Sequence, residues 1–152
     1  MSDSHDEVDP AGFGVLWPVG TRWDDNDHYG HVNNVTYYAF FDTAVNAWLI
    51  AVTGVDIRTL PAIGVVAETS CRYLRELSFP DQLAVGIAVE RLGSRSVTYR
   101  LAIFRRDGDA LQPAATGRFV HVYVDAETRR SVAIPEQIRS AVAELEAQQQ
   151  RP

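Results

Sequence analysis

The spacing of the apolar residues changes abruptly at Gly54. Between Asn34 and Gly54 they recur every three or four residues, which predicts a helix with one broad apolar face. Asn33 is a suitable N-cap and Gly54 a suitable C-terminal stop. The sequence therefore predicts one long helix, buried on most of its sides, whose apolar face is formed by Val35, Tyr38, Phe41, Val45, Trp48, Leu49 and Val52.

Beyond Gly54 the period becomes two, as in strands with one buried face. Short breaks with turn residues separate these segments and favour antiparallel neighbours. A terminal helix opens at Pro135. The alternating apolar faces are Phe13 to Val19 before the long helix and Val65 to Tyr73, Leu83 to Val89, Val97 to Ile103 and Val120 to Val124 after it, and the last helix has Ile138, Val142 and Leu145 on one face.

This order of elements predicts an α+β fold. An antiparallel sheet of about five strands has to cover one long apolar helix, so we expect the sheet to wrap around that helix in a hotdog-like architecture, with a short C-terminal helix. The length of 152 residues suits a single domain, which we place at residues 11–146. Residues 1–10 are predicted to be a disordered lead and residues 147–152 a frayed tail.

The composition restricts the partners and the compartment. The formal net charge of −6 argues against nucleic acid as a partner. No apolar run approaches the roughly 20 residues of a membrane span, and the N-terminus lacks a signal pattern. A single cysteine, Cys71, fits a reducing compartment. We therefore expect a cytoplasmic protein that contacts neither nucleic acid nor a membrane.

Polar and ionisable residues gather immediately before the long helix, at residues 24–34. The first backbone N–H groups of a helix have no partner within the helix and can stabilise a developing negative charge. A carboxylate held next to them can act as a nucleophile or as a general base. The start of the helix is therefore the predicted place of chemistry.

The run Asp25-Asn26-Asp27-His28-Tyr29-Gly30-His31-Val32-Asn33-Asn34, followed by Tyr37 and Phe41, resembles the signature of hotdog-fold acyl-CoA thioesterases of the 4-hydroxybenzoyl-CoA thioesterase-like group. The order of elements extends the resemblance from about Phe13 to Val124. It implies hydrolysis of an acyl thioester to a carboxylic acid and coenzyme A. No cofactor is implied, because coenzyme A is part of the substrate, and the expected assembly is a homodimer or homotetramer with active sites at the subunit interface.

The resemblance also assigns residues to roles. Asp27 falls on the catalytic carboxylate, and the backbone amide of Asn34 on the group that polarises the thioester carbonyl. Gly30 allows a tight turn and close approach of the substrate. His31 is assigned to the substrate site, with a structural hydrogen bond and a general base as the alternatives. The pair Arg95 and Ser96 matches residues that hold the phosphates of coenzyme A.

The same residues allow other interpretations. A calcium loop that began at Asp25 would need an acidic twelfth residue, and Thr36 stands there, so no metal is expected. A hotdog enoyl-thioester hydratase or dehydratase, and a non-catalytic module that binds acyl-CoA or an acyl carrier, are the alternative functions. The sequence does not identify the acyl group. It also leaves open whether the thiol is coenzyme A or an acyl-carrier protein, and whether Asp27 acts as a nucleophile or as a general base.

Overall fold

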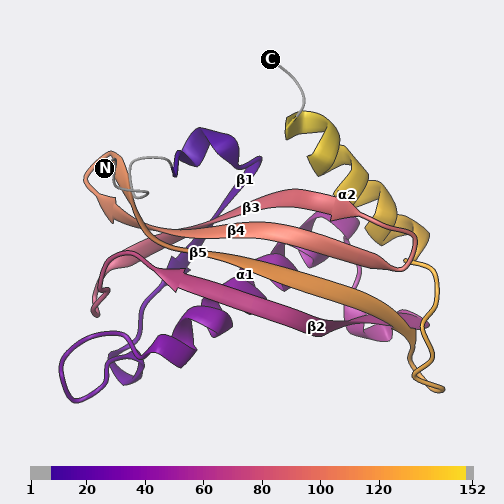
Figure 1. The fold of residues 1–152 in the computed structure, drawn as a ribbon, viewed down its shortest axis with the longest axis horizontal. Coiled ribbons are helices and arrows are strands. Elements are labelled where there is room, and N and C mark those ends of the chain that lie inside the picture. The colour runs from indigo at the N-terminus through magenta and orange to yellow at the C-terminus, as the bar shows by residue number, and fades with distance from the viewer. Residues whose placement is uncertain (1–7, 150–152) are drawn as a thin grey trace.

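The computed structural model describes residues 8–149, which form one five-stranded sheet with a long helix against it (Figure 1). The predicted α+β hotdog architecture is confirmed. In chain order the elements are η2 (Pro10–Gly12), β1 (Val15–Gly20), η3 (Trp23–Asp25), α1 (Asn34–Thr53), η4 (Ile57–Thr59), β2 (Ala62–Tyr73), β3 (Gln82–Leu92), β4 (Ser96–Asp107), β5 (Ala110–Asp125) and α2 (Glu136–Gln149), where η marks a short 3-10 helix.

The strands lie in the order β1-β3-β4-β5-β2, and every neighbouring pair is antiparallel. Figure 1 shows α1 running along one face of the sheet, with β2 as a long edge strand and α2 beside β3. The N-terminus of α1 lies at the end of the sheet where β2 finishes, because the phenol of Tyr73 donates to the carbonyl oxygen of Asn34. The start of β2, the β3–β4 turn and the end of β5 lie at the opposite end.

The buried face of α1 differs in part from the predicted one. The residues that pack into the core are Tyr37, Phe40, Phe41, Ala44, Val45, Trp48 and Leu49. Val35 is 69% exposed, since it lies two positions before Tyr37 and therefore on another side of the helix, and Val52 in the last turn is 51% exposed. Where the helix crosses β5, a Cβ on Gly117 would lie 2.7 Å from the ring of Phe41. The absence of a side chain there lets the helix lie close to the sheet.

By length and composition alone, α1 could cross a membrane, with a mean hydropathy of 1.2. This differs from the expectation that no apolar run approaches that length. The seven core residues of α1 are nonetheless packed against the sheet. α1 is therefore the core helix of this domain.

Two strands expose faces that alternation alone assigned wrongly. In β5 the residues that face the core are Phe119, His121 and Tyr123, whereas Val120 and Val122 lie on the outer face. In β2 the register shifts between Val66 and Glu68, so residues before and after this bulge change sides. An alternation of apolar residues cannot reveal a bulge. It also assigns a histidine to the exposed face, whereas His121 is buried.

The ends of the domain also differ from the predicted boundaries. Phe13 precedes β1 and packs on the outer face of the sheet, against Phe104. At the other end, α2 continues to Gln149, whose side-chain amide pairs with both backbone polar groups of Val89 in β3. Residues 147–149 are thus helical, while the rest of the expected tail and most of the expected lead lie outside the described residues.

Candidate active site

A short loop between η3 and α1 presents the residues of the sequence motif. The side chain of Asn33 accepts a hydrogen bond of 3.2 Å from the N–H of Val35, which confirms the predicted N-cap. The N–H of Asn33 in turn donates to the carbonyl oxygen of Asp25, at 2.9 Å. The cap therefore joins the start of the helix to the loop.

Asp27 begins a tight turn. Its carbonyl oxygen accepts from the N–H of Gly30 at 3.0 Å, and its own N–H donates to the carbonyl oxygen of His31 at 2.7 Å. Its Oδ1 accepts from the N–H groups of Tyr29 and His31, at 2.9 and 3.3 Å. Gly30 has a φ of +84°, a left-handed conformation that favours glycine. One carboxylate oxygen is thus held by the loop, and none of the described side chains or N–H groups bonds to the other, Oδ2.

Asn34 is the first residue of α1. No hydrogen bond among the described residues uses its N–H group, whereas its carbonyl oxygen accepts from the phenol of Tyr73 at 3.1 Å. An unpaired N–H at the positive end of a 20-residue helix is a suitable donor to an oxyanion.

A pocket of about 570 Å³ opens at this end of the sheet. Tyr37 and Tyr73 stand in its wall with their rings edge to face, 4.9 Å between centroids. Burial raises the pKa of the Tyr37 phenol to about 12 and also raises that of Tyr73, so both phenols stay neutral at pH 7. The pocket is lined by Asp27, Tyr29, His31, Val32, Asn34, Tyr37, Tyr73, Leu74, Arg75 and Glu76.

The side chain of His31 also lines this pocket. Its Nε2 lies 3.1 Å from a carboxylate oxygen of Glu76, and both side chains are substantially exposed. His31 thus has a partner of its own after β2, besides the backbone hydrogen bonds with Asp27. This arrangement suits the structural alternative raised for His31.

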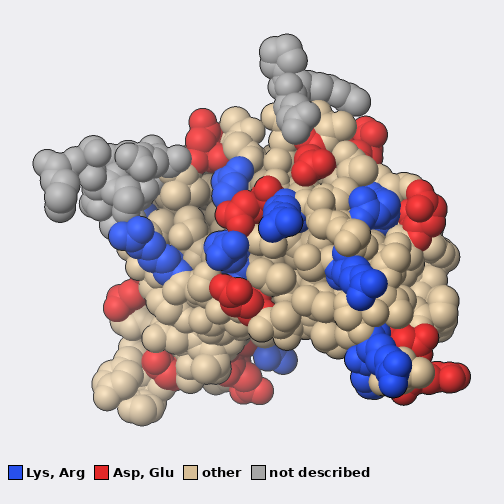
Figure 2. Space-filling model, turned by 45° about the vertical axis from the view of Figure 1, so that its right-hand side comes forward, with Lys and Arg blue, Asp and Glu red and all other residues tan. Residues whose placement is uncertain are grey.

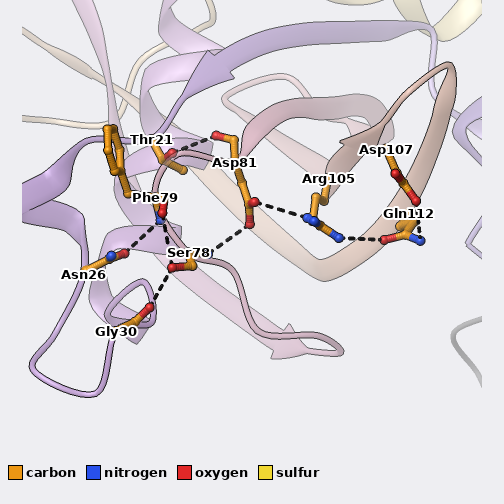
Figure 3. A network of polar contacts seen from close by, with 9 residues as sticks. All are labelled: Thr21, Asn26, Gly30, Ser78, Phe79, Asp81, Arg105, Asp107 and Gln112. Atoms are coloured by element: carbon orange, nitrogen blue, oxygen red, sulfur yellow. Dashed lines mark hydrogen bonds and ion pairs between the residues drawn. The ribbon is translucent and has the colours of Figure 1, made fainter.

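The loop is anchored to the rest of the fold by a polar network (Figure 3). The N–H of Phe79 donates to the side-chain oxygen of Asn26 at 3.0 Å, and the hydroxyl of Ser78 donates to the carbonyl oxygen of Gly30 at 2.7 Å. The carboxylate of Asp81 accepts from the N–H of Ser78 at 3.0 Å and pairs with Arg105 of β4 at 3.2 Å. The β2–β3 connection therefore fixes the turn that carries Asp27.

The carboxylate of Asp25 forms hydrogen bonds next to the loop and does not line the pocket. Its side chain is buried, and it accepts hydrogen bonds from the backbone and the guanidinium of Arg22, the shortest at 2.7 Å. Both of its carboxylate oxygens are occupied by these contacts, as befits a residue that orients the turn.

Arg95 and Ser96 do not join this site within one chain. They lie at the β3–β4 turn, at the end of the sheet opposite to Asp27. The length of β2, at about 3.3 Å per residue, sets these two ends roughly 35 Å apart. The guanidinium of Arg95 reaches the carbonyl oxygen of Ser131 at 3.4 Å, and Arg139 donates to the carbonyl oxygen of Gly93 in the same turn. The predicted phosphate contacts therefore require an arrangement that one chain does not supply.

Charge on the surface is mixed. Figure 2 shows arginine side chains interspersed with acidic ones over the face in view. Across the part of the chain that the structure describes, no three His, Cys, Asp or Glu side chains come together in a group that could hold a metal ion.

Several wall residues of the pocket were not assigned to the site from the sequence. Tyr73, Leu74, Arg75 and Glu76 follow one another at the end of β2, 46 or more positions after Asp27. The charged pair Arg75 and Glu76, directly after an apolar alternation, was the available signal. Only the pairing of β2 with β5, next to α1, brings them to the helix start.

Known proteins share both the sequence pattern and the fold of this chain. The model of the thioesterase-like superfamily matches residues 21–142. The PA5185 protein of Pseudomonas aeruginosa is 49% identical and superimposes with a TM-score of 0.83, covering 89% of this chain and 93% of that chain. A Thermus thermophilus thioesterase complexed with coenzyme A and zinc is 28% identical, with a TM-score of 0.73 and coverage of 93% of this chain and 98% of that chain.

A third relative is a larger protein. The L-carnitine dehydrogenase/betainyl-CoA thioesterase of Agrobacterium fabrum is 28% identical over 83% of this chain, which corresponds to 26% of its own length. The family match covers most of the chain and includes the motif at the start of α1. The chain therefore belongs to the thioesterase-like superfamily, and its enzyme class is that of thioester hydrolases.

Proposed function

We propose that the protein hydrolyses acyl-CoA thioesters, with Asp27 as the catalytic carboxylate and the N–H of Asn34 as the oxyanion donor. The observation that carries this proposal is the convergence of both groups on one pocket at the N-terminus of α1. Both Oδ2 of Asp27 and the N–H of Asn34 lack a hydrogen-bond partner among the described residues, so both are available to a substrate.

The same carboxylate serves either of two routes. As a nucleophile, Asp27 forms a bond to the thioester carbon, the C–S bond breaks, and the thiolate of coenzyme A leaves and takes a proton from solvent. Water then hydrolyses the resulting anhydride. As a general base, Asp27 instead takes a proton from a water molecule that attacks the same carbon. In both routes the carbonyl oxygen becomes negative and is stabilised by the helix start.

Coenzyme A is the thiol that the relatives support. The Thermus thermophilus thioesterase is complexed with it, and the Agrobacterium fabrum relative acts on betainyl-CoA. Coenzyme A is part of the substrate and supplies the leaving group, so the proposed reaction uses no further cofactor. The single cysteine, Cys71, is free, which suits the reducing cytoplasm where coenzyme A esters are found.

The assembly that fits this site is a homodimer joined through β2. This strand is an unpaired edge of 12 residues, and most of it is exposed on both faces. Val66 and Tyr73 are 46% and 41% exposed. A long apolar edge is a template for pairing with another chain. Two copies related by a two-fold axis would pair their β2 strands antiparallel and form one continuous sheet.

This dimer also explains the position of Arg95. With the axis near the middle of β2, the end at Tyr73 in one subunit lies beside the end at Ala62 in the other. The β3–β4 turn lies at that second end. Arg95 and Ser96 of the partner subunit would then stand near the thioester pocket, where they can hold the phosphates of coenzyme A. A homotetramer would be a pair of such dimers.

The test is thiol release from a panel of aromatic, short-chain and long-chain acyl-CoAs. We expect wild type to hydrolyse at least one of them and Asp27→Asn to lose most of that activity while it keeps its fold and its oligomeric state. Asp24→Asn is the matched control, because Asp24 is an exposed acid of η3, just before the loop, and does not line the pocket.

Three other outcomes of this test would contradict parts of the proposal. Unchanged turnover in Asp27→Asn would refute the assignment of the carboxylate. Binding of acyl-CoA without thiol release would favour a non-catalytic binding module. Hydration of an enoyl-CoA without thiol release would favour a hydratase.

A further inference from the structure

A second cavity, of about 260 Å³, lies at the opposite end of the sheet from Asp27. It lies between the second half of α1, η4, the start of β2, β5 and the start of α2, and is partly open to the surface. Most of its wall is apolar, and the side chains that give it this character are Leu49, Ile57, Leu60, Ile63 and Ile138. At about 30 Å³ for each water-sized group, it has room for about eight or nine non-hydrogen atoms.

One polar side chain in this wall has an unmet hydrogen bond. His121 of β5 is 3% exposed, and its Nε2 is buried without a partner among the described residues. The hydroxyl of Tyr99, on the neighbouring strand, is likewise buried without a partner, and its ring lies 5.4 Å from the imidazole between centroids. Buried polar atoms of this kind are normally paired. A ligand that offers a hydrogen bond would satisfy the imidazole.

The cavity favours an uncharged ligand. Burial lowers the pKa of His121 to about 4, partly offset by Asp42, so the imidazole is neutral at pH 7. Burial raises the pKa of Tyr123, another wall residue, to about 12. Arg58 at the cavity is bound by both carboxylate oxygens of Asp56, each at 2.9 Å. A carboxylate or an ammonium group would therefore enter without a free countercharge, at a large desolvation cost.

The place of the cavity in the proposed dimer connects it to the chemistry. Ile63 and Gly64, at the start of β2, form part of its wall. Tyr73 and Leu74, at the end of β2, form part of the wall of the thioester pocket. Antiparallel pairing of two β2 strands about their middle sets these two ends side by side. The cavity of one subunit then adjoins the thioester pocket of the other.

We propose that this cavity receives the far end of the substrate's acyl group, and that His121 selects acyl groups that carry an uncharged hydrogen-bonding group, such as a hydroxyl, at that end. The acyl group enters from the thioester pocket of the partner subunit. The inference rests on the proposed function and on the dimer, and it adds the substrate class. His121 is a specificity-determining residue, remote from the thioester carbon.

The test compares matched substrates that differ in one hydroxyl, namely hexanoyl-CoA with 6-hydroxyhexanoyl-CoA and octanoyl-CoA with 8-hydroxyoctanoyl-CoA. For at least one chain length, we expect wild type to have a kcat/KM about 10-fold or more higher for the hydroxylated ester. His121→Phe should abolish that ratio, and His121→Gln should keep part of it because glutamine also forms hydrogen bonds. Equal kcat/KM values in wild type at both lengths, or an unchanged ratio in His121→Phe, would overturn the proposal.

A binding measurement separates this proposal from the proposed function. In Asp27→Asn, 6-hydroxyhexanoate should shift the imidazole resonance of His121 in NMR spectra, and hexanoate should shift it less. That shift would support the cavity assignment even if Asp27 proved not to be the catalytic carboxylate. Equal shifts with the two acids would contradict the assignment of His121, whatever the fate of Asp27.

Discussion

The hydroxyl of Ser78 donates a hydrogen bond of 2.7 Å to the carbonyl oxygen of Gly30, across 48 residues of sequence. Gly30 closes the turn that begins at Asp27. Ser78 lies in the β2–β3 connection, so this bond holds the turn against a neighbouring segment that lies outside it (Figure 3). The position of the candidate catalytic carboxylate depends on contacts that the motif itself does not contain.

We expect Ser78→Ala to reduce kcat by about three- to ten-fold, with a smaller change in KM, because the loss of one hydrogen bond of about 1 kcal/mol loosens the turn. Steady-state kinetics with the best substrate of the acyl-CoA panel would measure this. Thr128→Ala is the control, since Thr128 also makes an exposed side-chain hydrogen bond, to the N–H of Arg130, at a turn outside the pocket. Equal losses in the two variants would remove the positioning role of Ser78.

The role of Asn34 can be separated into backbone and side chain. Asn34 is the first helical residue, where proline is tolerated, and Asn33 before it is extended, with φ −61° and ψ 137°. Asn34→Pro should keep α1 intact and lower kcat by about 100- to 1000-fold, because it deletes the oxyanion donor. Asn34→Ala retains the N–H and should stay within about threefold of wild type. Similar kcat values for the proline and alanine variants would show that this N–H takes no part.

Gly30 and Gly108 offer a matched pair of left-handed glycines. Their φ values are +84° and +62°, and a Cβ at either position would meet no atom within 4 Å. Alanine at either position should therefore cost about 1 kcal/mol in the free energy of unfolding, through backbone strain alone. Only Gly30→Ala should also lower kcat, since only Gly30 shapes the turn at Asp27. Urea denaturation and kinetics on both variants would test this, and full activity of Gly30→Ala would contradict it.

The buried His121 predicts how stability depends on pH. Its pKa falls from an ordinary value of 6.5 to about 4 in the folded protein, chiefly through burial. Between these values the unfolded chain binds more protons than the folded one, so stability is complete above pH 6.5 and is lost as the pH falls toward 4. From pH 7 to pH 5 the loss should be about 2 kcal/mol.

Urea denaturation of wild type and of His121→Gln at both pH values would isolate this contribution, because the carboxylates titrate in both proteins. We expect the fall in the free energy of unfolding to be about 2 kcal/mol larger in wild type. Equal falls would show that the imidazole is protonated as readily in the folded state as in the unfolded one.

The order of the elements could be predicted from periodicity, since α1 keeps a helical spacing and the inner faces of β3 and β4 alternate from Leu83 to Val89 and from Val97 to Ile103. The N-cap at Asn33 and the turn at Gly30 could also be predicted, because both follow from local chemistry. These local signals were sufficient to place the motif at the start of a buried helix.

The parts that could not be predicted depend on contacts between distant segments. The bulge between Val66 and Glu68 exchanges the faces of β2 without changing the alternation of residue types. The burial of the His121 side chain on the core face of the sheet depends on the register of β5 with β4. The separation of Arg95 from Asp27 depends on the direction of the strands. Each of these is a property of the sheet as a whole.

The helix α1 contributes to both cavities: its first residue, Asn34, lines one, and Asn46 and Leu49, about three and four turns later, line the other. In the proposed dimer, each helix thus supplies the oxyanion donor of one active site and the acyl wall of the second. Any displacement of α1 relative to β5, against which it packs at Gly117, would change both sites together. The position of one helix therefore determines the geometry of two reaction sites at once.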